Sequence, residues 1–216
     1  MIGRGAIAEN SNLLERPPCS QRGEPVWEVA YCYPRQGDWS EADFLEFETA
    51  NFPAELVDGC LEFLPMPTPS HQRLSRYLAR RLEDVVEAES LGEVLCAPCP
   101  IRLWVGRLRE PDVFYVGHDR QVECDKPPNG ADLVIEIISP GPTNRERDLV
   151  AKRNDYAQAG VAEYWIVDPD EQTVIVLSLD GQSYRTHGDF KPGAVAASLL
   201  LPKFQINVKE LFESAL

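Results

Sequence analysis

The stretch Ala131-Asp132-Leu133-Val134-Ile135-Glu136-Ile137-Ile138 holds the most apolar run of the 216-residue chain. Near-continuous hydrophobicity of this kind is typical of a central β-strand that helices cover on both faces. Pro140 and Pro142 end the run, because proline cannot donate a hydrogen bond to a neighbouring strand. We therefore predict an α/β domain that is built around a strand at 132–138.

Two amphipathic helices are expected on either side of this strand in the sequence. Residues 70–90 are predicted to form the first, with Ser70 as its N-cap and Gly92 near its end. Residues 145–159 are predicted to form the second, which Gly160 ends. The apolar residues at helical spacing are Leu74, Leu78, Leu82 and Val85 in the first helix and Leu149, Tyr156 and Ala159 in the second.

Shorter elements complete the predicted domain. A capping box at Ser40-Glu41-Ala42-Asp43 predicts a short helix after it, and a last helix is expected at 208–212. Two strands should meet at the Asp58-Gly59 turn within 55–64. The other predicted strands are 93–97, 101–105, 112–116, 163–167, 173–179, 184–187 and 198–201.

Residues 1–36 differ from the rest of the chain, because Gly, Pro, Ser and Asn are scattered there without sustained periodicity. A short strand at Val26–Tyr31 is the one regular element that we expect in this region. We predict a variable, partly disordered arm at 1–36, followed by one compact domain at 37–216.

The composition indicates where the chain is expected to be located and which partners its charge favours. No apolar run approaches the ~20 residues that span a bilayer, and the N-terminus lacks the apolar region of a secretory signal. We therefore expect a cytoplasmic protein with reduced thiols, in which Cys96-Ala97-Pro98-Cys99 lacks the further ligands of a metal site. The net charge of −14 argues against broad attraction to nucleic acid, although a local basic surface can still steer a substrate.

Glu136 is a carboxylate inside the strand that we expect to be the most buried. Alternate side chains share a face of a strand, so Glu136 lies on the same side as Val134 and Ile138. Burial of an ionised carboxylate is costly, and the position therefore implies a cation, a hydrogen-bond network or a raised pKa. Pairing with an arginine nearer the strand end is the structural alternative.

Asp112 follows Pro111 at the start of a predicted strand, 24 residues before Glu136. This separation allows a strand, a loop and a return strand beside it, so the two carboxylates can converge on one cation. Mg²⁺ accepts one or two carboxylates, keeps several waters, and can activate a water against a phosphodiester. An ordinary turn residue after proline is the alternative for Asp112.

Lys152 lies in the second predicted helix, one turn after Asp148. Because the connection at 139–144 is short, this helix must fold back against the strand of Glu136. Lys152 could then orient the attacking water or stabilise the developing charge on a phosphate. A surface ion pair between Asp148 and Lys152 is the alternative, and spacing alone favours it slightly.

Further polar residues are candidates of lower weight. Glu55, on an early strand, is either an additional acid or a solvent-facing residue, and His71, at a helix start, is interpreted as a cap or a surface residue. The polar face of the first helix carries a short basic stripe, formed by Arg73, Arg76 and Arg80.

Several segments together carry a family resemblance. They are Glu55–Gly59, Met66–Gln72, Glu110–Val113, Ala131–Pro140, Arg147-Asp148 with Lys152 and Tyr156, and Gly160–Pro169. In order and spacing they resemble the Uma-type family, a large bacterial group of restriction-endonuclease-like proteins in the PD-(D/E)XK nuclease superfamily. The similarity covers roughly residues 39–213.

The resemblance implies a restriction-endonuclease-like core, α/β (α+β), in which helices flank a mixed central sheet. It also implies an endonuclease that hydrolyses DNA phosphodiester bonds with Mg²⁺, or with Mn²⁺ in its place. Asp112 and Glu136 match the two metal-binding acids, Glu55 matches an additional catalytic acid, and Lys152 matches the catalytic lysine. The usual lysine position, two residues after the second acid, is Ile138 here, so a neighbouring helix would supply the lysine.

Three functions compete at this point. The first is a Mg²⁺-dependent DNA endonuclease whose basic stripe (Arg73, Arg76 and Arg80) holds the substrate backbone. The second is an inactive interaction module on a nuclease fold, favoured by the acidic charge, with acids that are splayed apart or neutralised by internal salt bridges. The third is a phosphodiesterase that acts on RNA or small nucleotides.

A homodimer is a further hypothesis, because nucleases that cut both strands of a duplex often present two sites related by a two-fold axis. Candidate contacts in the N-terminal arm are the aromatic residues Trp27, Tyr31 and Tyr33.

Overall fold

The computed structural model describes residues 20–23, 27–30, 32–48, 53–120 and 122–216. The chain divides into two compact units, Met1–Arg35 and Gln36–Leu216. In the first unit, α1 (Trp27–Ala30) is one helical turn, so the strand expected at 26–31 is wrong there. The Cys32 N–H donates to the Val29 carbonyl at 3.0 Å and satisfies the backbone locally, without a neighbouring strand. Val26 and Tyr31 lie outside the described residues.

A six-stranded sheet forms the centre of the second unit. Its strands are β3 (Gly92–Cys96), β6 (Val113–Gly117), β7 (Leu133–Ile137), β8 (Glu163–Asp168), β9 (Thr173–Asp180) and β10 (Ser183–Phe190). They lie in the order β10-β9-β8-β7-β6-β3. β7 runs parallel to β8, whereas all other neighbours are antiparallel, so the sheet is mixed as the resemblance implies.

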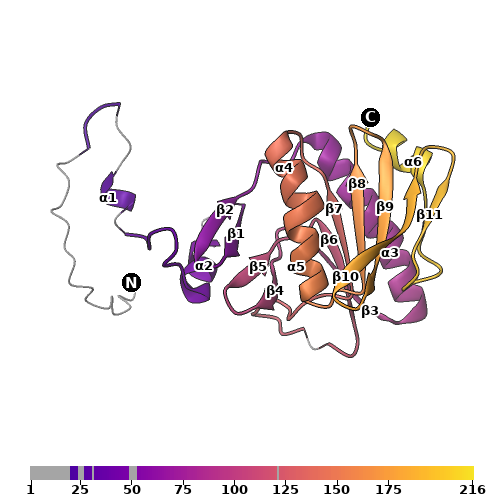
Figure 1. The fold of residues 1–216 in the computed structure, drawn as a ribbon, viewed down its shortest axis with the longest axis horizontal. Coiled ribbons are helices and arrows are strands. Elements are labelled where there is room, and N and C mark those ends of the chain that lie inside the picture. Colours follow the sequence, from indigo (N-terminus) through magenta and orange to yellow (C-terminus); the bar gives the residue numbers. More distant parts are fainter. Residues whose placement is uncertain (1–19, 24–26, 31, 49–52, 121) are drawn as a thin grey trace. The chain divides into compact units, whose positions relative to one another are not determined.

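Helices cover both faces of this sheet (Figure 1). One face holds α3 (Pro69–Glu89), and the other holds a continuous helix of α4 (Pro142–Glu146), the π-helical segment η1 (Arg147–Ala151) and α5 (Lys152–Gln158). All five residues of β7 are buried, and their alternation divides the core. Leu133, Ile135 and Ile137 pack in the cluster that contains α3 residues, whereas Val134 packs in the cluster that contains Tyr156 of α5. The central strand is therefore covered on both sides, as its sequence predicts.

The residue that caps the start of α3 differs from the predicted one. Thr68, rather than Ser70, caps the helix, because the Thr68 hydroxyl accepts the His71 N–H at 3.2 Å. Pro69 fills the first turn, where its missing N–H leaves no backbone partner unsatisfied. His71 therefore lies in the first turn of α3.

The end of α3 agrees with the predicted range of 70–90, but a glycine does not close the helix. Ser90 closes the helix in a left-handed conformation, with φ of 51°. Gly92 begins β3 instead of ending the helix. A Cβ at Gly92 would lie 2.1 Å from the Val116 carbonyl oxygen, so close pairing with β6 requires glycine there.

A second, four-stranded sheet has the order β2-β1-β5-β4. Its strands are β1 (Ala54–Val57), β2 (Cys60–Phe63), β4 (Ile101–Trp104) and β5 (Arg107–Arg109), and α2 (Glu41–Glu48) packs with it. The capping box before α2 is confirmed, since the Asp43 N–H donates to the Ser40 hydroxyl oxygen at 3.2 Å. The turn between β1 and β2 is also confirmed, with positive φ at both Asp58 and Gly59. Strand β5 was not expected, because only Leu108 of its three residues is apolar.

The C-terminal part contains β11 (Val195–Ala197), β12 (Gln205–Asn207) and α6 (Val208–Glu213). The last helix is confirmed, but the strand expected at 198–201 is wrong. The Leu201 N–H donates to the Ser198 hydroxyl oxygen at 2.8 Å, and the Leu199 and Leu200 N–H groups donate to the Glu163 carboxylate. These side-chain acceptors replace the partners that a strand would need.

Within the described ranges, no helix is long and apolar enough to cross a membrane. None of the described cysteines forms a disulfide, and Cys19 lies outside the described residues. The CxxC segment links the end of β3 to the start of β4, so strands flank it as its sequence suggests.

Candidate active site

A small cavity of about 70 Å³ lies beside the ends of β6 and β7. Its lining includes His71, Asp112, Glu136, Asp148 and Lys152. The segments that supply these side chains are α3, the residue before β6, strand β7 and the η1–α5 helix. Three of the residues that the sequence singles out for chemistry therefore share one cavity.

The two predicted metal-binding acids lie on neighbouring strands. β6 and β7 are antiparallel, and Val113 lies opposite Ile135. Asp112 immediately precedes β6, and its Oδ2 accepts the backbone N–H of Ile137 at 2.7 Å. Asp112 is thereby fixed next to the strand position of Glu136. The expected strand, loop and return strand are confirmed.

Lys152 is buried, with 2% of its surface exposed. Its ammonium donates to Glu136 Oε1 at 2.8 Å and lies 2.9 Å from Glu55 Oε1. Asp148 pairs instead with Arg147, whose Nε lies 3.1 Å from Asp148 Oδ1. The predicted surface pair of Asp148 and Lys152 is therefore wrong. Both side chains are buried, and Lys152 pairs with Glu55 of β1 and Glu136 of β7 at the same time.

Glu136 is held by two donors rather than by an arginine. The Tyr156 hydroxyl donates to Glu136 Oε1 at 2.6 Å, beside the bond from Lys152. Burial raises the pKa of Glu136 to about 8; Lys152 opposes this rise, whereas the charges of Asp112 and Asp148 add to it. The cavity thus concentrates carboxylate charge, which a further cation would relieve.

Glu55 is fully buried, so the solvent-facing interpretation is wrong. Its Oε2 accepts from Arg109 Nη1 at 2.7 Å, and its Oε1 accepts from the Glu110 N–H at 2.9 Å. Burial opposes ionisation, but Lys152 and Arg109 outweigh it and lower the pKa of Glu55 to about 2. Glu55 is therefore an ionised anchor for the lysine.

Arg109 is a residue that sequence reasoning missed. Its side chain is 1% exposed, and its Nη2 and Nε lie 2.7 and 2.9 Å from Asp155 Oδ2. Nη1 also lies 2.8 Å from Glu62 Oε2. The guanidinium thus connects Glu55 of β1 and Glu62 of β2 to Asp155 of α5. Asp155 lies one helical turn after Lys152. An arginine within the run Arg107-Leu108-Arg109 gives no sequence signal of burial.

His71 is also closer to the site than its sequence position suggested. Its Nε2 lies 3.4 Å from Asp112 Oδ2, and its side chain is 13% exposed. Burial disfavours the imidazolium, but Asp112 raises the pKa of His71 above its usual value. The interpretation of His71 as a cap or a surface residue is wrong, because the side chain faces the cavity while Thr68 caps the helix.

The basic stripe on α3 borders the acidic cavity. Arg73, Arg76 and Arg80 are exposed and line an open groove of about 590 Å³. Gln72 and Ala97 line both this groove and the acidic cavity. Arg73 Nη1 also donates to the carbonyl oxygens of Ala215 and Leu216, at 3.1 and 2.8 Å. Arg73 thus has a structural contact with the C-terminal backbone in addition to its place in the groove.

The donor set of the cavity fits a hard divalent cation. Asp112 and Glu136 supply carboxylate oxygens, the ligands that Mg²⁺ prefers, and their repulsion contributes to the raised pKa of Glu136. Among the described residues, no group of three or more His, Cys, Asp or Glu side chains is arranged to hold a metal. Two protein carboxylates suit Mg²⁺, which keeps several water ligands, better than an all-protein cage.

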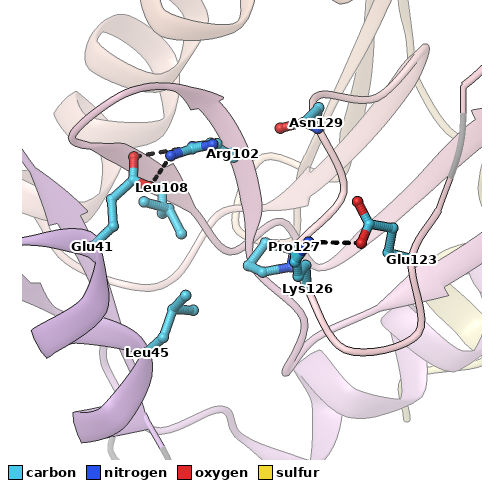
Figure 2. A pocket seen from close by; sticks show the side chains of 8 residues that line it. All are labelled: Glu41, Leu45, Arg102, Leu108, Glu123, Lys126, Pro127 and Asn129. Atoms are coloured by element: carbon cyan, nitrogen blue, oxygen red, sulfur yellow. Dashed lines mark hydrogen bonds and ion pairs between the residues drawn. The ribbon is translucent and has the colours of Figure 1, made fainter.

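Another cavity, of about 260 Å³, is lined by residues of α2, the four-stranded sheet and the loop before β7 (Figure 2). Its charged side chains are paired with one another. Arg102 Nε lies 3.0 Å from Glu41 Oε1, and Lys126 Nζ lies 2.7 Å from Glu123 Oε2. Despite its larger size, this cavity holds none of the acids that converge on Lys152.

The comparisons with known proteins agree with this architecture. A solved structure from Anabaena variabilis, described as "a putative nuclease belonging to DUF820", matches with a TM-score of 0.66 and 21% identity. The match covers 82% of this chain and 99% of that chain, and at this identity it shows the fold. No curated protein matches the chain. The family model Uma2, described as "Putative restriction endonuclease", matches residues 41–209, and the chain therefore belongs to the Uma2 family.

Proposed function

We propose that the chain is an endonuclease that hydrolyses DNA phosphodiester bonds with Mg²⁺, with Mn²⁺ as an alternative cation. Family membership supports a nuclease reaction. The observation that carries the assignment is the convergence of Asp112, Glu136 and Lys152 on one cavity, with the buried Glu55 behind the lysine. A lysine paired with both glutamates in the interior is costly to build for stability alone.

Asp112 and Glu136 would hold the cation. When bound, Mg²⁺ would polarise a phosphate oxygen and lower the pKa of a water. The Ile137 N–H on Asp112 Oδ2 restrains this carboxylate, and Tyr156 and Lys152 restrain Glu136. The protein thereby keeps its two acidic groups oriented in advance.

Lys152 would stabilise the charge that develops on the phosphate. An ammonium has three N–H donors, and two of them point at Glu55 and Glu136. We assign the third to an oxygen of the scissile phosphate. The position replaces the lysine that the superfamily usually places two residues after the second acid, where this chain has Ile138.

The groove beside the cavity supplies a local basic surface on an acidic protein. Arg76 and Arg80 are exposed on α3, in the groove that shares Gln72 and Ala97 with the cavity. Phosphate contacts by arginine provide most of the sequence-independent affinity for DNA. We propose that one strand of the substrate follows this groove to the acids.

The inactive interaction module stays a second candidate for two reasons. Lys152 neutralises Glu55 and Glu136 through internal ion pairs, as that alternative also expects, and the net charge is −14. RNA or a small nucleotide is the other alternative substrate, since the cavity itself is small.

Cleavage assays separate these functions. Supercoiled plasmid, single-stranded DNA, RNA and a bis-nitrophenyl phosphodiester are incubated with wild type, Asp112→Asn and Lys152→Met, with Mg²⁺, Mn²⁺ or EDTA. The proposal expects plasmid cleavage by wild type with either metal and loss of cleavage with EDTA and in both variants. Intact DNA with cleaved RNA or small diester would select the phosphodiesterase, and intact substrates throughout would select the interaction module.

Oligomeric state and cellular location stay predictions. Tyr33 is 44% exposed, whereas Tyr31 lies outside the described residues and the Trp27 side chain is not described. A light-scattering mass equal to one 24.2 kDa chain would exclude the proposed homodimer.

A further inference from the structure

We propose that Arg147 binds the scissile phosphate through its Nη2 group and, together with Lys152, stabilises the charge that develops there. This inference rests on the proposed function and adds a residue to it. The resemblance to the Uma-type family includes Arg147 but implies no task for it.

Arg147 reaches the cavity from the helix that covers the other face of the sheet from the basic stripe (Figure 1). It is the first residue of η1, and it lines the cavity together with Asp148. Gln72 of α3 lines the same cavity and also the groove that contains Arg76 and Arg80. A substrate strand that follows this groove to the acids therefore meets a further arginine on the second helix.

The guanidinium of Arg147 is held by two neighbouring side chains. Its Nε lies 3.1 Å from Asp148 Oδ1, and its Nη1 donates to Asn144 Oδ1 at 3.3 Å. Asn144 is itself oriented, because its Nδ2 donates to the Pro140 carbonyl at 2.7 Å. The arginine is therefore positioned before a substrate binds, which reduces the entropy that binding has to remove.

The Nη2 group of Arg147 is left for a ligand. Within the described ranges, the contacts of Arg147 use Nε and Nη1, and none uses Nη2. The described polar atoms that are buried without a partner are His71 Nδ1 and Arg107 Nε, so Nη2 is accessible from solvent. The side chain as a whole is 16% exposed. A guanidinium has five N–H donors, and both donors of Nη2 remain for an anion.

An arginine suits this cavity because its acids would repel a phosphodiester anion. Burial disfavours the guanidinium charge, but neighbouring acids, of which Asp148 contributes most, raise the pKa of Arg147 above its usual value. Glu55 and Glu136 also contribute, so the guanidinium lies within electrostatic range of both glutamates. Lys152 is shared between these two glutamates. A guanidinium adds a planar fork that matches phosphate oxygens, whereas an ammonium is a point charge.

The competing explanation is a purely structural role, in which Arg147 only compensates the buried charge of Asp148. Two substitutions separate the roles: Arg147→Met removes the cation, whereas Arg147→Lys keeps a cation beside Asp148 but removes the fork. Arg153→Met is the matched control, because Arg153 lies on α5, lines a different groove and donates to the Tyr184 carbonyl.

Three properties are measured for wild type and the variants. The first is kcat and KM for plasmid and for a bis-nitrophenyl phosphodiester with Mg²⁺. The second is the affinity for inorganic phosphate, by calorimetry in the presence of Mg²⁺. The third is the thermal midpoint. The small diester has no further phosphates to occupy the α3 groove, so a loss on this substrate locates the contact at the reacting phosphate.

We expect Arg147→Met to cleave both substrates with a kcat lower by about 100-fold, the loss that follows removal of one donor to a developing anion. Arg147→Lys should keep the thermal midpoint of wild type and bind inorganic phosphate about 10-fold more weakly, the equivalent of one hydrogen bond to a charged group. Its cleavage of both substrates should fall as well. Arg153→Met should match wild type in every measurement.

Cleavage and phosphate affinity at wild-type levels in Arg147→Lys would overturn the proposal, because a cation beside Asp148 would then be sufficient. This variant decides the question even if Arg147→Met does not fold. If wild type cleaves neither substrate, the proposed function fails, but the phosphate affinities still decide the contact. Equal affinities of wild type and Arg147→Lys would then exclude it.

Discussion

The ammonium of Lys152 lies 2.8 Å from Glu136 Oε1, although one residue is on a helix and the other is on the central strand. Both side chains are almost completely buried, with exposed fractions of 2 and 4%. Each therefore depends on the other for compensation of its charge in a medium that solvates ions poorly.

Replacement of Lys152 by methionine should lower the free energy of unfolding, because it leaves Glu136 buried without its cation. Breaking a buried pair in this way costs about 3–5 kcal/mol, measured by urea denaturation. The double variant Lys152→Met/Glu136→Gln should recover part of this loss while remaining inactive. If Lys152→Met is as stable as wild type, the pair does not form in solution.

Asp112→Asn should weaken Mg²⁺ binding at least about 10-fold, since it replaces an ionised ligand by an amide. Stability should change little, because the asparagine side-chain oxygen can still accept the Ile137 N–H. Calorimetric titration tests the first statement and urea denaturation the second. Asp119→Asn, an exposed aspartate beyond the other end of β6, is the matched control. Equal Mg²⁺ affinities of the two variants would remove Asp112 from the metal site.

Glu55 should make the protein sensitive to acid. Its pKa falls from 4.5 to about 2 on folding, so its ionised form stabilises the folded state above pH 4.5, and this contribution is lost as the pH falls through 2. The loss amounts to roughly 3 kcal/mol. Unfolding free energies between pH 6 and 2 should therefore decrease more steeply for wild type than for Glu55→Gln. Parallel curves would mean that Glu55 is not paired with Lys152 and Arg109.

The double variant Arg76→Ala/Arg80→Ala should raise KM for DNA with little change in kcat. The dependence of log affinity on log salt should become shallower by about 1 for each phosphate that an arginine no longer neutralises. Arg73 is left intact, because it also contacts the C-terminal backbone. The control is Arg81→Ala, which removes an exposed arginine from the same helix. An unchanged salt slope in the double variant would place the substrate elsewhere.

The sequence predicted the central strand and its acid well, for a physical reason. Every residue of β7 except Glu136 is apolar, so one carboxylate in a strand covered on both faces stands out. Asp112 was expected beside it because 24 residues are enough for a strand, a loop and a return strand, although spacing alone left an ordinary turn residue as the alternative. Thus Glu136 follows from the local pattern, whereas Asp112 was singled out by chain length together with the family resemblance.

Lys152 and Arg109 could not be found in the same way. Hydrophobic periodicity identifies a buried face only where that face is apolar, whereas Lys152, Asp148 and Asp155 face inward from the η1–α5 helix. Their burial depends on partners that are distant in the sequence, such as Glu55 for the lysine. The family resemblance, rather than the helical pattern, pointed to Lys152.

The π-helical segment Arg147–Ala151 has a consequence for how the family can diversify. A π turn holds one residue more than an α turn, and one residue turns an α-helix by about 100°. The π turn absorbs this residue locally, so the helical segments on either side of it keep their faces while Lys152 and Tyr156 hold Glu136. A difference of one residue in chain length can therefore be accommodated at Arg147–Ala151 with Lys152 still facing Glu136.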